Sequence, residues 1–295
     1  ALGGLFRPGH RPAARRALAL TVPYRNSYEQ LARPFRVQYH AAVPTADGTV
    51  LVLGGSRGES TVSDAIDRFD PAARTFTRIG TLRTGRSNHT ATTLADGRVL
   101  VLGGNVSLDI GAVADLVDPR TGAVSDGGRL QQPRFRHAAV ALADGRMLVV
   151  GGWARNTVEL WDPATNTFRL VAARMRHVRE YPTATLLADG RVLIVGGYHE
   201  SPQNVFAEIF DPRTETFTAV DSQVNERRHF HQAHRQADGS VLIIGGEVIE
   251  GDRIVPLASV LRFDPARGTL APVRGLDVAR TVVRSRACSA VRNMA

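Results

Sequence analysis

The sequence predicts an all-β protein built from repeated four-stranded sheets. An eleven-residue segment, LADGRVLVLGG at 94–104, recurs along the chain with small changes. Glycine is frequent and aromatic residues are scarce, at 28 residues and 6% of the chain, which suits a protein with many turns. The second glycines of the copies are 49, 48, 45 and 49 residues apart, and they are Gly55, Gly104, Gly152, Gly197 and Gly246.

Each repeat contains the signals of four strands. A short segment such as 89–94 is the innermost strand, and the Asp-Gly turn at 96–97 returns the chain as a buried strand, because Asp-Gly suits a hairpin turn with positive φ at both central residues. A third strand such as 158–163 ends in a D-P-x-T-x-T-F turn, where aspartate caps and proline presets φ. A fourth strand opens on the phenylalanine. Strand-rich repeats of this length are typical of β-propeller blades.

The repeats resemble the kelch repeat over nearly the whole chain. The residues that carry the resemblance are the pair Gly103-Gly104 after an apolar strand and the aromatic residues Phe76, Phe217 and Trp161 on later strands. The paired glycines are expected where strands crowd and a side chain would clash. The resemblance implies four-stranded antiparallel blades around a central channel.

We expect six blades within one domain, residues 1–295. The sixth blade is expected to combine 1–31 with 277–295, because joining both ends of the chain closes the ring and hides two strand edges. The predicted repeat cores are 40–82, 89–130, 137–175, 182–224 and 231–276.

Composition limits the classes of partner. The net charge of +9 comes from arginine without lysine, but no basic stripe with interleaved aromatic residues favours nucleic acid, so none is expected. No apolar run reaches the roughly 18 residues of a membrane span. Cys288 is the sole cysteine, which excludes an intramolecular disulfide. Because the chain opens at Ala1 rather than Met, we expect that a segment was removed upstream, either a signal peptide or part of a longer chain. A secreted or periplasmic monomer is expected.

One arginine recurs at the same place in each repeat, three residues before the innermost strand. These arginines could form a ring at the channel mouth that grips carboxylates, sulfates or phosphates. Alternatively, each could join its blade to the next by bonding backbone carbonyls or the acids Asp64, Glu159 and Glu208. The members of the series are Arg86, Arg134, Arg179, Arg228 and Arg280, with Arg36 one place out of register.

The residues after the paired glycines differ between blades. Trp153 and Tyr198 could stack a sugar or another ring, or could simply pack their loops. His199, Glu200 and His229 are the candidate catalytic residues, as an acid–base group. A stacking role for Trp153 and Tyr198 and an acid–base role for the other three residues could exist in the same site.

Four histidines, at 40, 89, 137 and 231, share one repeat position and are interpreted as structural. His229 and His231 would share one face of an extended strand and could bind a metal with His199, or with His177, Glu200 or Glu247, as third ligand. This site is the weaker interpretation, and no cofactor is expected.

Some kelch propellers are copper oxidases of the galactose oxidase type. That resemblance implies two histidines, two tyrosines, one of them crosslinked to a cysteine, and a ligand from a further C-terminal domain. Here Cys288 lies near the end of the sequence, and copper chemistry is not expected. The tyrosines show no matching arrangement; they are Tyr24, Tyr28, Tyr39, Tyr181 and Tyr198.

The favoured function is a non-catalytic binding module for an acidic ligand, such as an acidic peptide, a glycan or a carboxylate, or for a protein partner. The alternative is an isomerase- or lyase-type enzyme that acts on an anionic sugar or small carboxylate. It would use the same arginines with a histidine or glutamate as acid–base group.

Overall fold

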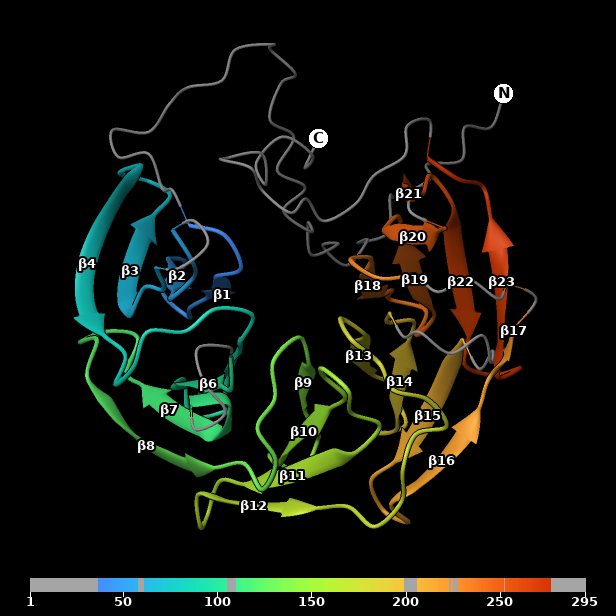
Figure 1. Cartoon of the computed structure of the whole chain (residues 1–295), viewed down its shortest axis with the longest axis horizontal. Coiled ribbons are helices and arrows are strands. Elements are labelled where there is room, and N and C mark those ends of the chain that lie inside the picture. Colours follow the sequence, from blue (N-terminus) through green and yellow to red (C-terminus); the bar gives the residue numbers. More distant parts are fainter. Residues whose placement is uncertain are drawn as a thin grey trace, which may run out of the picture.

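The computed structural model confirms the predicted all-β propeller. Its described residues are 37–57, 61–104, 110–198, 206–222, 224, 228–251 and 253–276. Within them the regular structure is β, apart from the short 3-10 turn η1 (Ile110–Ala112). Five antiparallel blade sheets stand in an arc around a common axis (Figure 1).

The blades follow one another along the chain, and each pairs its strands in sequence order. The first comprises β1 (Ala41–Pro44), β2 (Val50–Leu53), β3 (Ala65–Asp70) and β4 (Thr75–Thr81). The second comprises β5 (Thr90–Thr93), β6 (Val99–Leu102), β7 (Val113–Val117) and β8 (Val124–Arg129). The third comprises β9 (Ala138–Ala141), β10 (Met147–Val150), β11 (Val158–Asp162) and β12 (Thr167–Leu170).

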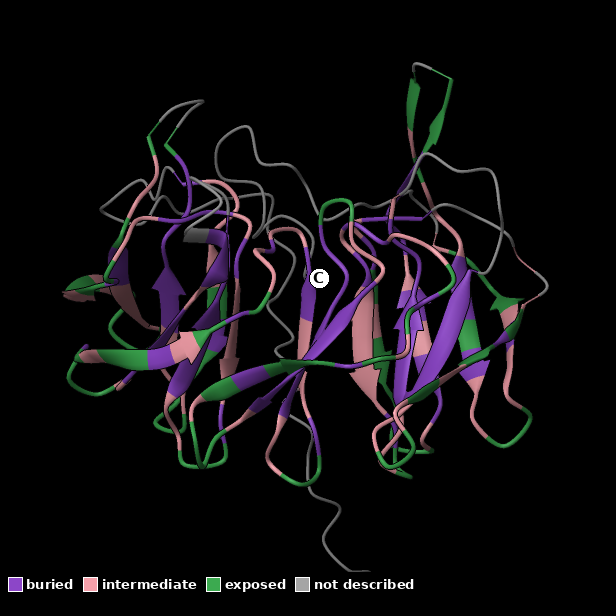
Figure 2. Ribbon diagram, turned by 60° about the horizontal axis from the view of Figure 1, so that its bottom comes forward, coloured by how far each residue is buried: buried purple, intermediate pink, exposed green. Residues whose placement is uncertain are grey.

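The fourth blade comprises β13 (Thr183–Leu186), β14 (Val192–Val195), β15 (Ala207–Asp211) and β16 (Thr216–Ala219). The fifth comprises β18 (Gln232–Arg235), β19 (Val241–Ile244), β22 (Val260–Asp264) and β23 (Thr269–Val273), and β17 (Asp221–Ser222) adds a short parallel strand to β23. A hairpin of β20 (Glu247–Glu250) and β21 (Arg253–Pro256) is inserted between β19 and β22 and projects from one end of the molecule (Figure 2).

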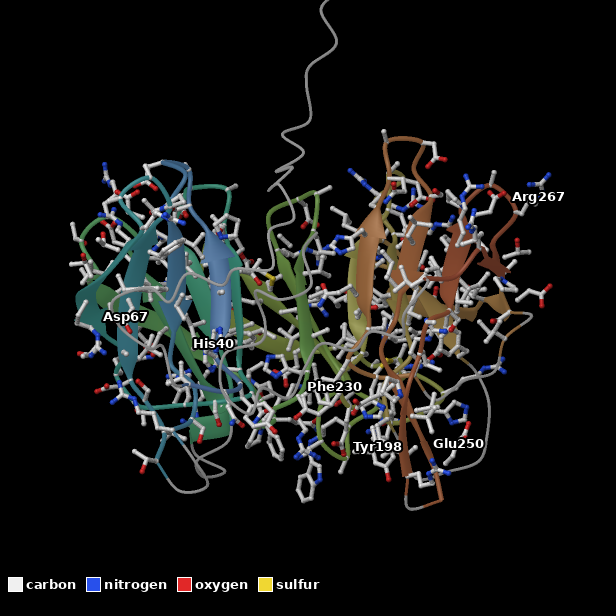
Figure 3. The ribbon with its side chains drawn as sticks, turned by 90° about the horizontal axis from the view of Figure 1, so that it is seen from above. His40, Asp67, Tyr198, Phe230, Glu250 and Arg267 are labelled. Atoms are coloured by element: carbon white, nitrogen blue, oxygen red, sulfur yellow. The ribbon has the colours of Figure 1, made fainter. Side chains whose placement is uncertain are left out.

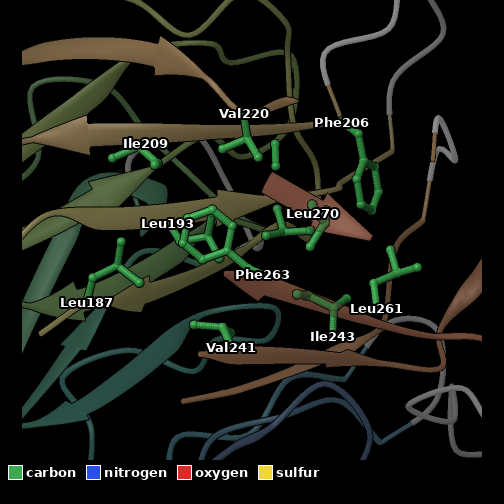
Figure 4. Close-up of a cluster of buried hydrophobic side chains, with 12 residues drawn as sticks. Leu187, Leu193, Phe206, Ile209, Val220, Val241, Ile243, Leu261, Phe263 and Leu270 are labelled. Carbon is green, nitrogen blue, oxygen red and sulfur yellow. The ribbon is translucent and has the colours of Figure 1, made fainter. Parts of the chain in front are cut away.

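The core lies between successive blades. The innermost strands β1, β5, β9, β13 and β18 neighbour one another in turn around the axis. The second strand of blades two to four is buried at every residue, because a neighbouring blade covers each of its faces, and this explains its unbroken apolar sequence. Between blades four and five, Leu193, Val241 and Phe263 belong to one buried cluster (Figure 4).

The turns at the far end follow the sequence signals, with one correction. In the Asp-Pro turns the aspartate caps as predicted: Asp162 Oδ1 accepts the N–H of Ala164 at 2.8 Å. In the Asp-Gly turns, however, only the glycine has positive φ, as at Gly97 (87°). The N–H of Gly97 donates to the carbonyl of Leu94 at 3.0 Å, so this turn is longer than the two-residue hairpin that was predicted.

The predicted sixth blade, residues 1–31 and 277–295, lies outside the described residues, as does Cys288. The five described blade sheets span 41–81, 90–129, 138–170, 183–219 and 232–273, each inside one predicted repeat core.

Candidate functional site

The paired glycines end the second strand at the place where the next blade begins. The N–H of Gly55 donates to the carbonyl of Arg86 in the following blade at 2.8 Å. A Cβ atom on Gly54 would lie 2.6 Å from that carbonyl and 2.8 Å from the ring of His89. Both glycines have positive φ. The pair is therefore required by close packing between blades, as the sequence predicted.

The recurring arginines are buried, which corrects the prediction that they line the channel mouth. At most 1% of the surface of each described member, Arg86, Arg134, Arg179 and Arg228, is exposed. Arg134 Nη1 donates to the carbonyls of Gly151 and Thr157, both at 2.8 Å, and Nη2 lies 3.1 Å from Glu159 Oε1. The guanidinium N–H groups are all directed at buried acceptors of the blade, so they cannot bind an external ligand.

The same arrangement recurs in neighbouring blades. Arg86 pairs with Asp115 at 2.7 Å and Arg179 with Glu208 at 3.0 Å. Burial lowers the pKa of Arg134 and Arg179, and the adjacent carboxylate opposes this shift. The structural interpretation of the arginines is therefore correct for these blades.

Two details of the arginine prediction need correction. Asp64, expected to accept a bond from an arginine, is exposed; the repeat position that holds Glu159 and Glu208 is occupied in blade two by Asp115. In blade five Leu261 takes this position, and Arg228 instead donates to the side chain of Ser259. Arg36 and Arg280 lie outside the described residues.

Two histidines of the repeat join adjacent blades. His137 Nε2 lies 2.9 Å from Thr90 Oγ1, and His231 Nε2 lies 2.9 Å from Thr183 Oγ1. Burial, together with nearby positive charge, lowers the pKa of His89, His137 and His231 to about 3. These rings are neutral at physiological pH and have a structural role.

Among the described residues, the structure brings only two of the candidate metal ligands together, His229 and Glu247. Phe230 has a φ of 53°, so the backbone is not extended from His229 to His231 and the alternation assumed for that pair is wrong. His229 Nε2 instead lies 3.1 Å from Glu247 Oε1, with the histidine 2% exposed. Over the part of the chain that is described, no three metal-binding side chains gather in one place. His199 and Glu200 lie outside it.

A second position per blade, which the sequence analysis missed, approaches the axis. It is the residue directly before the repeat histidine or its equivalent, and in all five blades it has a φ between 53° and 58°. In blades two to four its N–H donates to the carbonyl of the same residue in the preceding blade, as from Asn88 to Tyr39 (2.9 Å) and from Tyr181 to Arg136 (2.7 Å). The five residues are Tyr39, Asn88, Arg136, Tyr181 and Phe230.

Side chains from this position and its neighbours form a continuous row of rings across blades three to five, which we call the axial strip. The guanidinium carbon of Arg136 lies 5.4 Å from the ring centre of Phe135 and 5.3 Å from that of Tyr181. Trp153 stacks on Phe135 at 5.5 Å, and the rings of Tyr181 and Phe230 are 4.2 Å apart. The row therefore consists of aromatic rings with one cation, Arg136, held between the rings of Phe135 and Tyr181.

Polar contacts fix the strip. Arg136 Nη1 donates to Glu180 Oε2 at 2.9 Å, and Tyr181 Oη donates to Asn88 Oδ1 at 2.8 Å, across the intervening blade. At the far end, Tyr198 lies against His229, with ring centres 5.8 Å apart. Tyr198 is thus part of the strip as well as of its loop.

The strip lies at the end of the axis that carries the loops between second and third strands, which we call the mouth face. Phe230, Tyr198 and Glu250 of the projecting hairpin lie toward the same side in Figure 3. Trp153 occupies an equivalent loop and is 52% exposed, so it presents one ring to solvent. The sequence prediction of Trp153 and Tyr198 thus identified two residues of this face.

Comparisons with known proteins support the fold. Residues 39–83 and 134–174 match the kelch motif. The chain is similar in structure to a fungal alcohol oxidase described as having catalytic diversity among the AA5 family, solved in complex with copper, with a TM-score of 0.65 and 18% identity. The similarity covers 82% of this chain and 54% of the oxidase, so this chain spans about half the length of that enzyme. No curated protein sequence matches significantly.

The described residues do not fit a copper centre like the one in that oxidase. The rings of His137 and His231 are buried against threonine hydroxyls, and His229 is paired with Glu247. We derive no function through copper.

The kelch matches fall on the first and third blades, and the paired glycines give the other described blades the same construction. The chain is therefore a β-propeller that contains kelch motifs.

Proposed function

We propose that the protein is a non-catalytic interaction module that binds an acidic ligand on its mouth face, with Arg136 as the contacting cation. Kelch motifs are found in propellers that mediate protein interactions, which supports the general class. The acidic ligand is the more specific part of the proposal.

The observation that carries the proposal is the difference between Arg136 and the arginines of the repeat. Its side chain is 33% exposed, whereas that of Arg134 is 0% exposed. Burial alone would lower the pKa of Arg136, but the hydrogen bond and charge of Glu180, together with Tyr181, raise it, so the group stays charged. Glu180 occupies one edge of the guanidinium, and a ligand carboxylate can take another.

The rings on either side of Arg136 strengthen its use as an anchor. Phe135 and Tyr181 restrict the side chain, so less conformational entropy is lost when a ligand binds. They also remove water from around the guanidinium, which strengthens a charge-assisted hydrogen bond. An acidic peptide with an apolar neighbour beside its carboxylate would satisfy both features.

The catalytic alternative has less support. His229 is buried and paired with Glu247, and neither His199 nor Glu200 is described. That enzyme remains a prediction of the sequence.

The test compares Arg136→Ala with Arg98→Ala. Arg98 is exposed and paired with Asp96 at the opposite end of the molecule, so both variants lose one charge. Binding of a glutamate-rich peptide and of a uronic acid is measured by titration calorimetry. We expect Arg136→Ala to lose about tenfold or more in affinity, as for one charge-assisted hydrogen bond, and Arg98→Ala to bind like the parent. Equal losses in the two variants, or no binding of any acid by the parent, would overturn the proposal.

A further inference from the structure

In the part of the chain that the structure describes, several arginines are paired with an aspartate of the same turn. At the end opposite the mouth face, arginines of the Asp-Gly turns are neutralised within the turn: Arg98 by Asp96, Arg146 by Asp144 and Arg191 by Asp189, each at 2.7 Å. The Asp-Pro turns repeat the pattern in Arg213 with Asp211.

Three arginines in the loop that follows Trp153 and in the loop hydrogen-bonded to it are not paired in this way. Arg155, Arg174 and Arg176 lie in the two loops 153–157 and 171–182, and none of them forms an ion pair with any residue that the structure describes. The only acid of these two loops is Glu180, which is bound to Arg136.

Hydrogen bonds hold the two loops together. The N–H of Met175 donates to the carbonyl of Asn156 at 2.9 Å, and the N–H of Arg179 donates to the carbonyl of Arg155 at 3.2 Å. Asn156 Nδ2 donates to the carbonyl of Met175 at 3.2 Å. The two loops that carry Trp153 and the three arginines are thus joined through their backbones, and we call these four residues the basic cluster.

We propose that the basic cluster binds an anionic polysaccharide, sulfated or uronate-bearing, with one sugar ring stacked on Trp153 and the acidic groups paired with Arg155, Arg174 and Arg176. This inference rests on the proposed function and names the class of its ligand. It also extends the contact surface outward from Arg136.

The chemistry of the cluster favours a sugar over other polyanions. The indole of Trp153 is backed by Phe135 and remains 52% exposed, and the apolar C–H face of a pyranose packs against such a flat ring. Guanidinium groups match sulfate and carboxylate in shape. A single-stranded nucleic acid would use several exposed rings in succession, whereas Trp153 is the only aromatic residue among the large apolar residues found exposed in the described chain. An acidic peptide would have no need of the indole.

The experiment measures binding of a heparin oligosaccharide, with polyglutamate, oligo-dT and a neutral oligosaccharide as competitors. Three variants are used: Arg155→Ala/Arg174→Ala/Arg176→Ala, Trp153→Ala, and the matched control Arg98→Ala/Arg146→Ala/Arg191→Ala. The control removes the same charge from the opposite end, and every replaced side chain is at least partly exposed, so thermal unfolding should stay cooperative in all three.

We expect the cluster variant to bind heparin at least about tenfold more weakly than the control variant, and to show a smaller dependence on salt. Trp153→Ala should weaken heparin binding more than it weakens any polyglutamate binding, because only the sugar is proposed to stack on the indole. Equal losses in the cluster and control variants would mean attraction by net charge alone and would refute the inference, as would tighter binding of oligo-dT. If polyglutamate binds through Arg136 and heparin does not bind, the glycan inference fails while the proposed function stands.

Discussion

Replacing Arg134 by methionine should destabilise the protein strongly, although Arg134 is one of many arginines in the chain. In the folded protein its guanidinium contacts Glu159 and the carbonyls of Gly151 and Thr157. Methionine fills much of the same space but offers no donor. Glu159, itself 0% exposed, would then remain as a buried charge.

The expected loss follows from that burial. Removing one member of a buried ion pair costs about 3–5 kcal/mol, because the other charge is left without compensation. Glu159 keeps the backbone N–H groups of Gln131 (2.7 Å) and Gln132 (3.1 Å), which places the expected loss toward the lower end. By contrast, an exposed pair such as Arg98 with Asp96 contributes about 0–1 kcal/mol.

Urea unfolding measures both values, with Arg98→Met as the matched control. A double variant, Arg134→Met with Glu159→Gln, should recover part of the loss, because glutamine carries no charge and its amide oxygen can still accept one of the two backbone N–H groups. If Arg134→Met is no less stable than Arg98→Met, the buried ion pair of Arg134 with Glu159 does not stabilise this blade. A ligand-binding role for Arg134 would then have to be considered again.

Three further predictions concern the framework and the mouth face. His137 has a folded pKa of about 3 and an unfolded pKa near 6.5, so its stabilising contribution is complete above pH 6.5 and is lost as pH falls toward 3. His137→Gln should therefore flatten the decrease in the free energy of unfolding between pH 6.5 and 5. An unchanged slope would contradict this. Gly103→Ala, which drives a Cβ atom into the next blade, should cost well over the roughly 1 kcal/mol expected for Gly97→Ala, where the space is open; equal losses in thermal unfolding would show that crowding is not the reason for the pair. Trp161→Phe loses part of the ring and the buried hydrogen bond to the carbonyl of Gly127, and it should lower the free energy of unfolding by about 1–3 kcal/mol. Trp153→Phe, at an exposed residue, should change it by less than about 0.5 kcal/mol. Calorimetry that ranks the two variants in the opposite order would refute this.

Repetition made the framework predictable from the sequence. The same residues recur in each blade because each blade packs against its neighbour in the same way. These residues are the paired glycines such as Gly103 and Gly104, the aspartate of each turn and the repeat histidines. The role of the arginines as staples was one of two open interpretations. The alignment of Asp115 with Glu159 and Glu208 was also present in the sequence. Attention to that register would have identified Asp115 in blade two, and Asp67 rather than Asp64 in blade one.

The site was less predictable, because its residues do not repeat. Arg136 and Tyr181 occupy a position that differs in all five described blades except for a recurring tyrosine, so no pattern marks it as important. Their significance depends on a left-handed backbone conformation at that position and on contacts to Phe135 and Phe230. The alternation that placed His229 and His231 on one face failed for the same reason.

By itself, then, the sequence determined that the chain folds into blades, where each blade begins and which residues join it to the next, because these are local patterns that recur. Only the tertiary structure decided which arginines are buried and which meet solvent. Exposure depends on how neighbouring blades close over a side chain, and Arg134 and Arg136 differ in this respect although they are two residues apart.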